Sequence, residues 1–251
     1  MLTNFVYKDS VIHKLNPLVK LFWTLLIIIV SFASFDLKYL IFLAITSFLI
    51  ILLTKLSVRI MKASFFVLFP LLIMLIIFHG IVNPSATQVL FKAWFFSVKL
   101  DGLLLGLKYF FRLANFIMIA YVLIFTTHPS DLINSLLKIG LPKQLGYAVL
   151  ATTQFIPLMI NDAKTIMDAQ QARGLETKGN VVKRVLGFTP MIMPVILSSI
   201  DSAYERTISL EIRSFFNSTK RTSFRDFVWK KSDTYSIIIM FLIVVLGGIF
   251  L

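Results

Sequence analysis

Long apolar runs separated by short polar segments fill the first half of the chain, and one more run closes it. A helix needs roughly 20 apolar residues to cross the hydrocarbon core of a bilayer. Five runs approach that length and define the expected spans: Leu18–Phe35, Leu37–Leu53, Ala63–Val82, about Leu100–Phe125, and Tyr235–Leu251. The pattern therefore predicts an all-α membrane protein with about five transmembrane helices.

The segment between the fourth and fifth expected spans has a different pattern, in which apolar residues recur at helical spacing among polar ones. Spacings of three, four and seven residues place such positions on one face of a helix. We expect a short helix with Ser130 as its N-cap and Gly140 as its stop, followed by two long amphipathic helices. The apolar faces of the long helices contain Phe155, Met159, Ile166 and Ala169 in the first and Ile192, Ile196, Ile200 and Ala203 in the second.

The two long helices need a surface on which to bury their apolar faces, so they cover each other or lie against the membrane. The first is expected to begin near Pro142 and to end at Gly174, and the second to extend from about Val182 to Phe216. These patterns divide the chain into three parts. They are a membrane module with spans one to four (1–125), a second module with the amphipathic helices (126–233), and the last transmembrane helix (234–251).

Basic residues indicate the orientation of these spans. Cytoplasmic loops carry the excess of Lys and Arg in membrane proteins. Lys8, Lys14 and Lys20 precede or begin the first span, and residues 126–233 carry 14 Lys and Arg against 9 Asp and Glu, a net charge of +5. We therefore expect a multi-pass protein of the cell membrane, with its N-terminus and residues 126–233 in the cytoplasm.

Composition supports the membrane assignment and excludes several other classes. The chain has 251 residues, 58% of them hydrophobic and 25 of them Phe, and its mean hydropathy is +0.87. A soluble domain is nearer to about 45–50% apolar. The net charge of +13 is spread along the chain without a recognition motif, which indicates anionic membrane lipid as a partner rather than nucleic acid. The absence of Cys excludes disulfides and thiolate metal sites.

Both long amphipathic helices are expected to end on an arginine. The first closes with Ala172, Arg173 and Gly174, and the second with Glu211, Ile212, Arg213 and Ser214. Arginine in a last turn complements the helix dipole, and glycine commonly follows the cap. Arginine is also a fork of donors that binds a carboxylate bidentately, so a helix end can present it to a soluble partner. The presence of two such ends in one module favours the second interpretation.

Two basic residues lie within the fourth expected span, four positions apart on one helix face. Intramembrane charges usually face protein or water and indicate function. Lys108 and Arg112 are therefore candidates for contact with a membrane partner or, equally, for pairing within the bundle. His13, His79 and His128 are scattered and lack carboxylates at ligand spacing, so we expect no metal site.

Four segments of the chain carry recognisable motifs in a fixed order. They are SVIHKLNPLVKL (10–21), GLKYFFRLANFIMIAYVLIFTTHPSDL (106–132), LPKQLGYAVLATTQFIPLMINDAKTIMDAQQARG (141–174) and PVILSSIDSAYERTISLEIRSF (194–215). Together they resemble the transmembrane T component of energy-coupling factor transporters, the family that includes permeases of the CbiQ type. The first segment resembles the family signature Leu-His-x-Leu-Asp-Pro-x-x-Lys-Leu, with Asn16 where aspartate is usual.

The resemblance includes departures from the family pattern. The last segment differs from the usual ending Glu-Ala-Arg-Gly, because Ile212 and Ser214 replace alanine and glycine. Gln154 also stands where the family often has arginine. The Ala-Arg-Gly ending at Arg173 is retained.

This resemblance implies a non-catalytic coupling subunit. Family members bridge two cytoplasmic ATP-binding cassette ATPase subunits and one small substrate-binding membrane protein, the S component, which captures a vitamin or a metal ion. By this likeness Arg173 and Arg213 contact the two ATPases, and their neighbours complete the binding sites (Ala172, Gly174, Glu211, Ile212 and Ser214). ATP and Mg²⁺ are then held by the partners, because this chain has no G-x-x-x-x-G-K-[ST] loop to cradle phosphates and no cofactor is expected in it.

Other classes of membrane protein fit the sequence less well. An ordinary ABC permease would line the substrate path itself and would show one short coupling loop instead of two long helices ending in arginine. An intramembrane enzyme needs paired acids or His and Glu clusters, whereas four expected spans contain no Asp or Glu and Asp101 stands alone at the edge of the fourth. Secondary transport would be supported by an internal repeat, and none is visible.

Overall fold

The structure, a computed structural model, describes residues 10–79, 89–93, 96–174, 181–215 and 229–250. The chain forms two compact units. One unit, which we call the bundle, combines Thr3–Gly140 with Phe227–Leu251, and the other, which we call the hairpin unit, contains Leu141–Asp226 together with Met1–Leu2.

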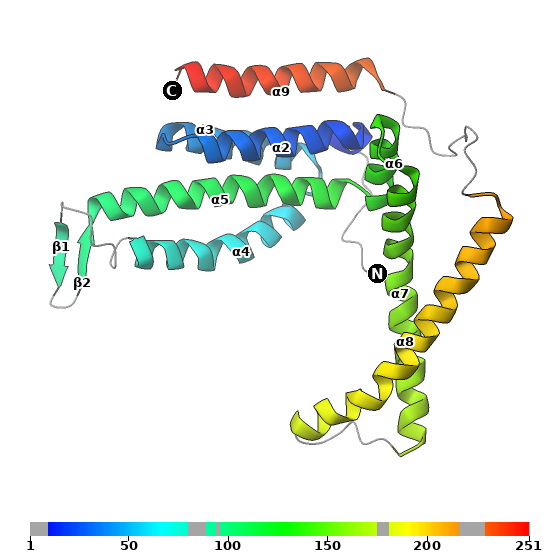
Figure 1. Cartoon of the computed structure of the whole chain (residues 1–251). Helices are drawn as coiled ribbons and strands as arrows, with labels where there is room; N and C mark the ends of the chain where they lie inside the picture. Colours follow the sequence, from blue (N-terminus) through cyan, green and yellow to red (C-terminus); the bar gives the residue numbers. More distant parts are fainter. Residues whose placement is uncertain (1–9, 80–88, 94–95, 175–180, 216–228, 251) are drawn as a thin grey trace. The chain divides into compact units, whose positions relative to one another are not determined.

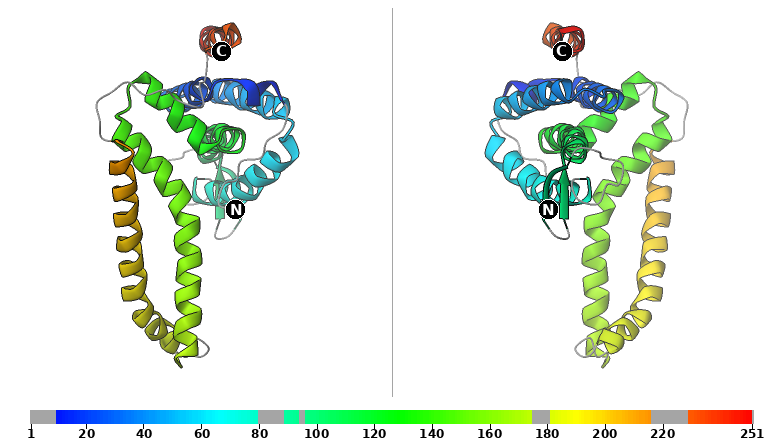
Figure 2. Two further views of the ribbon diagram at one scale, coloured as in Figure 1. Left: turned by 90° about the vertical axis from the view of Figure 1, so that its right-hand side faces the viewer. Right: turned by 90° about the vertical axis from the view of Figure 1, so that its left-hand side faces the viewer.

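The bundle is built around one long central helix. Its helices are α1 (Val11–Lys14), α2 (Pro17–Ala33), α3 (Leu37–Leu53), α4 (Ser57–Ile77), α5 (Leu100–Thr126), α6 (Pro129–Ile139) and α9 (Lys231–Phe250). Within it, α5 lies between α4 on one side and the neighbouring α2 and α3 on the other, and α9 lies on the far side of α2 and α3 (Figure 1). The end-on view of α5 shows the same arrangement (Figure 2).

The apolar helices of the bundle agree with the predicted all-α membrane protein. Within the described part of the chain, three of them are long and apolar enough to cross a membrane, at Val58–Ile77, Leu100–Thr126 and Lys231–Gly248. The other two expected spans form apolar helices, α2 and α3, of 17 residues each. That length is at the short end of the range of about 17–25 residues for a transmembrane helix.

Two of the expected spans begin several residues earlier in the structure. The third begins at Ser57 and not at Ala63, so Arg59 and Lys62 lie in the first turns of α4 instead of in a loop. Both residues are good helix formers, and the edge of an apolar run does not by itself end a helix. The fifth begins at Lys231 and not at Tyr235, because Asp233 joins its first turn, where a negative charge favours the helix dipole.

The predicted loop before the fourth span contains a short antiparallel hairpin. Strand β1 (Val89–Ala93) pairs with β2 (Phe96–Lys99), with Val89 opposite Lys99 and Ala93 opposite Phe96. Val and Phe residues, which favour strands, recur in both sequences. This hairpin is a small addition to an otherwise helical fold.

The short helix α6 begins differently from the prediction. Its N-cap is His128, whose Nδ1 accepts a hydrogen bond from the Ser130 N–H at 3.2 Å, so the assignment of Ser130 as N-cap was wrong. Pro129 explains the shift, because proline is suited to the first helical position. The predicted stop is confirmed, since Gly140 caps the end of α6 with φ 118°.

The hairpin unit consists of two long helices, α7 (Lys143–Ala172) and α8 (Val181–Ile212). The Tyr147 ring, near the start of α7, packs on the Phe215 ring just beyond the end of α8, with ring centroids 4.8 Å apart. Further along, the Arg206 guanidinium lies 3.4 Å from the centroid of the Phe155 ring. The helices are therefore antiparallel, and α8 runs back along α7 (Figure 2).

Candidate functional site

The end of α7 has the geometry that an arginine–glycine ending predicts. Arg173 is the cap residue, with φ −85° and ψ 7°, and Gly174 follows with φ 93°. The Gly174 N–H donates to the Gln171 carbonyl at 3.0 Å, which satisfies one of the last helical carbonyls. Glycine suits this position because it adopts positive φ without steric cost.

The end of α8 forms the same turn without glycine. Ser214 takes φ 53°, and its N–H donates to the Glu211 carbonyl at 2.8 Å. The Phe215 N–H donates to the Leu210 carbonyl at 2.9 Å, which completes the pair of bonds of a Schellman motif. The two helix ends therefore share one backbone geometry, with Arg173 and Arg213 at equivalent positions.

Both helix ends are accessible. Arg173 and Arg213 are exposed, as are their neighbours Ala172, Gly174, Glu211 and Ser214. Ile212 is 80% exposed, an unusual value for an isoleucine in a helix. Because α7 and α8 are antiparallel, the arginines lie at opposite ends of the unit, separated by a helix length of about 45 Å. A single binding groove cannot receive both.

The strained backbone at Ser214 gives a first prediction. Replacing Ser214 with glycine removes the cost of a left-handed conformation, so the free energy of unfolding should rise by up to about 1 kcal/mol. Gly174→Ala should lower it by about 1 kcal/mol for the opposite reason. Thermal unfolding of the purified chain in detergent micelles measures both changes.

The matched control is the same substitution within α8. Ser202→Gly places glycine in the middle of a helix, where it should lower the free energy of unfolding by about 0.5–1 kcal/mol. If Ser214→Gly destabilised the chain as much as Ser202→Gly does, the shared turn geometry would not determine the stability of the α8 end.

The N-terminal motif SVIHKLNPLVKL connects several helices of the bundle through hydrogen bonds, which the sequence reasoning did not predict. The Asn16 side chain caps α2 by accepting from the Leu18 N–H at 3.1 Å. The Asn16 N–H in turn donates to Asp233 Oδ1 at 3.1 Å, and Asp233 Oδ2 accepts from the Lys230 N–H at 2.9 Å. The buried carboxylate of Asp233 thus attaches the start of α9 to the start of α2.

The lysine of the same motif is buried in the bundle. Lys20 is 3% exposed, and its Nζ donates to the Thr126 carbonyl, at the end of α5, at 2.9 Å. The sequence reasoning used this lysine to infer orientation and as the lysine of the family signature, and neither use predicted its burial. A lysine that binds the carbonyls at a helix end is favourably placed in the field of that helix.

The two basic residues within α5 differ in their surroundings. Arg112 donates from Nε to the Ser31 carbonyl at 3.1 Å and from Nη2 to the Ser34 carbonyl at 2.6 Å, so it binds the last carbonyls of α2. Lys108 is half-buried and makes no hydrogen bond or ion pair with any residue in the described part of the chain. A role of either residue toward a membrane partner remains a prediction.

The positioned side chains contain no cluster of three or more His, Cys, Asp or Glu that could hold a metal ion, as far as the described residues extend. The two arginine-bearing helix ends of the hairpin unit are exposed features with a defined geometry.

Comparisons with known proteins match this chain over most or all of its length. The family described as cobalt transport protein (CbiQ) matches residues 8–223. The energy-coupling factor transporter transmembrane protein EcfT of Streptococcus thermophilus is 31% identical over 93% of this chain and 92% of the relative. The protein of that name from Streptococcus equi subsp. equi is 31% identical over 100% of this chain and 95% of the relative, and that from Lactococcus lactis subsp. cremoris is 27% identical over 98% and 97%. The chain therefore belongs to the EcfT/CbiQ family of energy-coupling factor transporter transmembrane proteins.

Proposed function

We propose that this chain is the non-catalytic coupling subunit of an energy-coupling factor importer in the cell membrane. Two ATPase subunits bind and hydrolyse ATP with Mg²⁺, and a small S component in the membrane captures a vitamin or a metal ion. This chain connects them through residues 126–233, with its N-terminus on the cytoplasmic side. The main support is the pair of equivalent, exposed arginine ends at opposite ends of the hairpin unit.

The separation of the arginines supports one ATPase at each helix end. In this proposal each guanidinium binds a carboxylate at the base of a groove on one ATPase, because a planar fork of donors suits bidentate contact. Ala172 and Gly174 allow close approach at the first end, whereas Glu211, Ile212 and Ser214 surround Arg213 at the second. The large exposed side chain of Ile212 contributes apolar contact area that alanine would not supply.

The proposed transmission of motion depends on the stiffness of α7 and α8. Helix α7 has 30 residues with Pro157 inside it, and α8 has 32 residues with Pro190 and Pro194 inside it. Because proline kinks a helix, the uninterrupted stretches 158–172 and 195–212, which lead to the two arginine ends, are the parts that move as rods when a partner displaces those ends. Exposed apolar residues recur every four positions along α8, at Ile192, Ile196, Ile200, Tyr204, Ile208 and Ile212. Such a ridge suits contact with apolar helices of a membrane partner. ATP-driven closing of the two ATPases would then displace the S component through this surface.

Site-specific crosslinking tests the proposed arrangement. The chain has no Cys, so Ala172→Cys and Ser214→Cys each introduce a single thiol beside one arginine. We expect each variant, in the assembled complex, to crosslink to an ATPase subunit, and in a complex with two different ATPases the two variants should reach different ones. Mass spectrometry of the crosslinked products identifies the partner.

The control for crosslinking is a thiol on the exposed side of α7 away from both ends. Lys164→Cys serves this purpose, because Lys164 is exposed and lies eight residues before Ala172, the last residue of α7. Equal crosslinking from position 164, or crosslinks from 172 and 214 to the S component alone, would contradict docking of the ATPases at the helix ends.

A further inference from the structure

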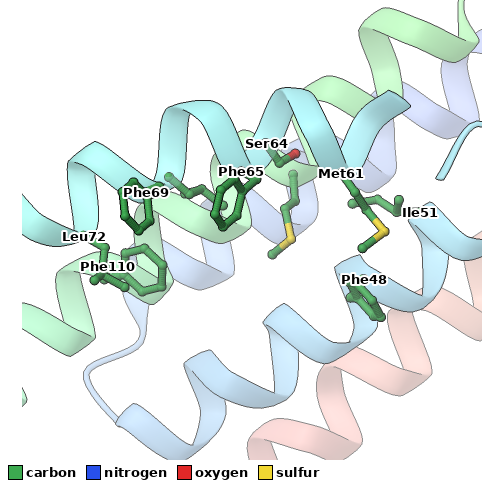
Figure 3. Close-up of a pocket in the computed structure, with 10 residues that line it drawn as sticks. Phe48, Ile51, Met61, Ser64, Phe65, Phe69, Leu72 and Phe110 are labelled. Atoms are coloured by element: carbon green, nitrogen blue, oxygen red, sulfur yellow. The ribbon is translucent and has the colours of Figure 1, made fainter. Parts of the chain in front are cut away.

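An apolar groove lies in the bundle between α3 and α4, with α5 behind it (Figure 3). Helices α3 and α4 both pack on α5, and side chains of all three line a cavity of about 270 Å³. Phe48 lies on α3, Phe65 and Phe69 on α4, and Phe110 on α5. A groove of this kind on a membrane helix bundle offers space for a flexible hydrocarbon chain.

The groove contains one unpaired buried hydroxyl group. Ser64 lines the cavity, is 5% exposed, and its Oγ has no hydrogen-bond partner among the residues with described positions. Other buried hydroxyls of the bundle, such as those of Thr24 and Thr126, donate to a carbonyl of the preceding turn. The hydroxyls of Ser31, Ser47 and Thr127 are also unpaired, but these residues do not line this cavity. The free Ser64 hydroxyl therefore indicates an acceptor supplied by a ligand in the groove.

The start of α4, at one end of the groove, favours an anion. Arg59 and Lys62 are exposed there, and no Asp or Glu occurs between residues 37 and 79. The Arg59 guanidinium lies 5.7 Å from the centroid of the Phe125 ring, which keeps it at this end of the bundle. The N-cap residue Leu56 makes no side-chain cap bond, so the first N–H groups of α4 add to the positive potential.

From these three features we propose that the groove binds one anionic phospholipid. The acyl chain occupies the cavity between Phe48, Phe65 and Phe69, the Ser64 hydroxyl donates to the ester carbonyl, and the phosphate lies beside Lys62 and the first turn of α4. A phospholipid carries hydrocarbon, ester and phosphate in this order. The eight residues from Ser64 to Leu72 give about 12 Å of helix along which the chain can lie. A helix of a partner protein would use the apolar walls but would leave the hydroxyl and the basic residues without matching groups.

Native mass spectrometry of the full chain, delipidated and titrated with defined lipids, tests the site. We expect one phosphatidylglycerol to remain bound at concentrations at which phosphatidylcholine with the same acyl chains does not. Lys62→Glu should weaken phosphatidylglycerol binding by at least about fivefold, as expected for a basic residue near an anionic headgroup. Ser64→Phe should fill the groove and abolish binding. Lys38→Glu, at an exposed lysine at the start of α3, should have no effect.

Several results would overturn the proposal. Equal binding of the two lipids, or equal effects of Lys62→Glu and Lys38→Glu, would exclude recognition of the phosphate at this end of α4. Binding of glycerol phosphate with the affinity of the whole lipid would exclude the acyl chain as part of the ligand. The groove would instead belong to the partner protein if the lipid were released on assembly of the complex and Phe65→Cys crosslinked to the S component. Lys62→Glu is a surface substitution, so it tests the site even if Ser64→Phe does not fold.

Discussion

Replacing Arg173 and Arg213 together with alanine is expected to abolish co-purification of the ATPase subunits and ATP-driven uptake. Each arginine is proposed to enter a groove and form a charge-assisted contact, and removing one partner of such a pair costs about 2–5 kcal/mol of binding free energy. A single change should therefore weaken docking at one end by a factor of at least about 30. The double change should leave neither end attached. Pull-down of the ATPases from membranes and uptake of the transported substrate measure the two effects.

The controls separate a lost contact from a damaged helix. Lys164→Ala removes an exposed basic residue from the same helix and should change neither docking nor uptake. Arg173→Lys and Arg213→Lys keep the charge but lose the planar fork, so they should show an intermediate effect. Because alanine accepts the cap conformation of Arg173, with φ −85°, thermal stability should remain close to that of the unchanged chain. Full docking and full uptake in the double variant would contradict the proposed contact.

The pattern of apolar residues predicted a helix well where the same pattern continues over the whole length of that helix. Span two has the predicted limits Leu37–Leu53, and α7 ends at Ala172 as the Ala-Arg-Gly sequence indicates. The pattern failed where polar residues extend a helix beyond its apolar part, as Arg59 and Lys62 do at the start of α4. Hydrophobicity reports which part of a helix faces lipid, whereas backbone hydrogen bonding and capping decide where the helix begins.

The equivalence of the two arginine ends could be only partly predicted. The sequence shows Gly after Arg173 but Ser after Arg213, and a serine rarely adopts positive φ. The two backbone hydrogen bonds at the end of α8 reveal that Ser214 takes the left-handed conformation all the same. The opposite placement of the ends also needed the structure, since the contact of Tyr147 with Phe215 defines the antiparallel pairing.

Long-range polar contacts were not predictable from sequence spacing. Lys20 and Thr126 are 106 residues apart, and Asn16 and Asp233 are 217 residues apart. Each of these residues alone fits a common local role, as a flanking charge, a cap or a loop acid. Only their contacts in the folded bundle show that the N-terminal motif joins α2 to the end of α5 and to the start of α9.

Lys20→Met is expected to destabilise the bundle by about 1–3 kcal/mol, the cost of leaving a buried carbonyl without its hydrogen-bond partner. Methionine has a similar length but no donor, so the buried Thr126 carbonyl would lose its partner. The Asp131 carboxylate in the first turn of α6 attracts the Lys20 ammonium, and it would also lose a nearby cation. Burial of the Lys20 ammonium itself carries a desolvation cost that methionine avoids, and Asp131 is half-buried, so the net loss stays within this range. Thermal unfolding of the purified chain in detergent micelles measures the loss.

The consequence of Lys20→Met should extend to transport, because Lys20 links α2 to the end of α5 and to α6. Helix α6 directly precedes α7, and α7 carries Arg173 at its far end. A looser α5–α6 junction gives the start of α7 more freedom, so displacement of the helix end by an ATPase would be transmitted less completely to the bundle. We therefore expect lower uptake with unchanged ATPase co-purification, the reverse of the pattern for the arginine variants. Lys38→Met, at an exposed lysine of α3, is the matched control. Unchanged stability and uptake in Lys20→Met would show that the hydrogen bond to Thr126 holds neither the bundle nor the junction.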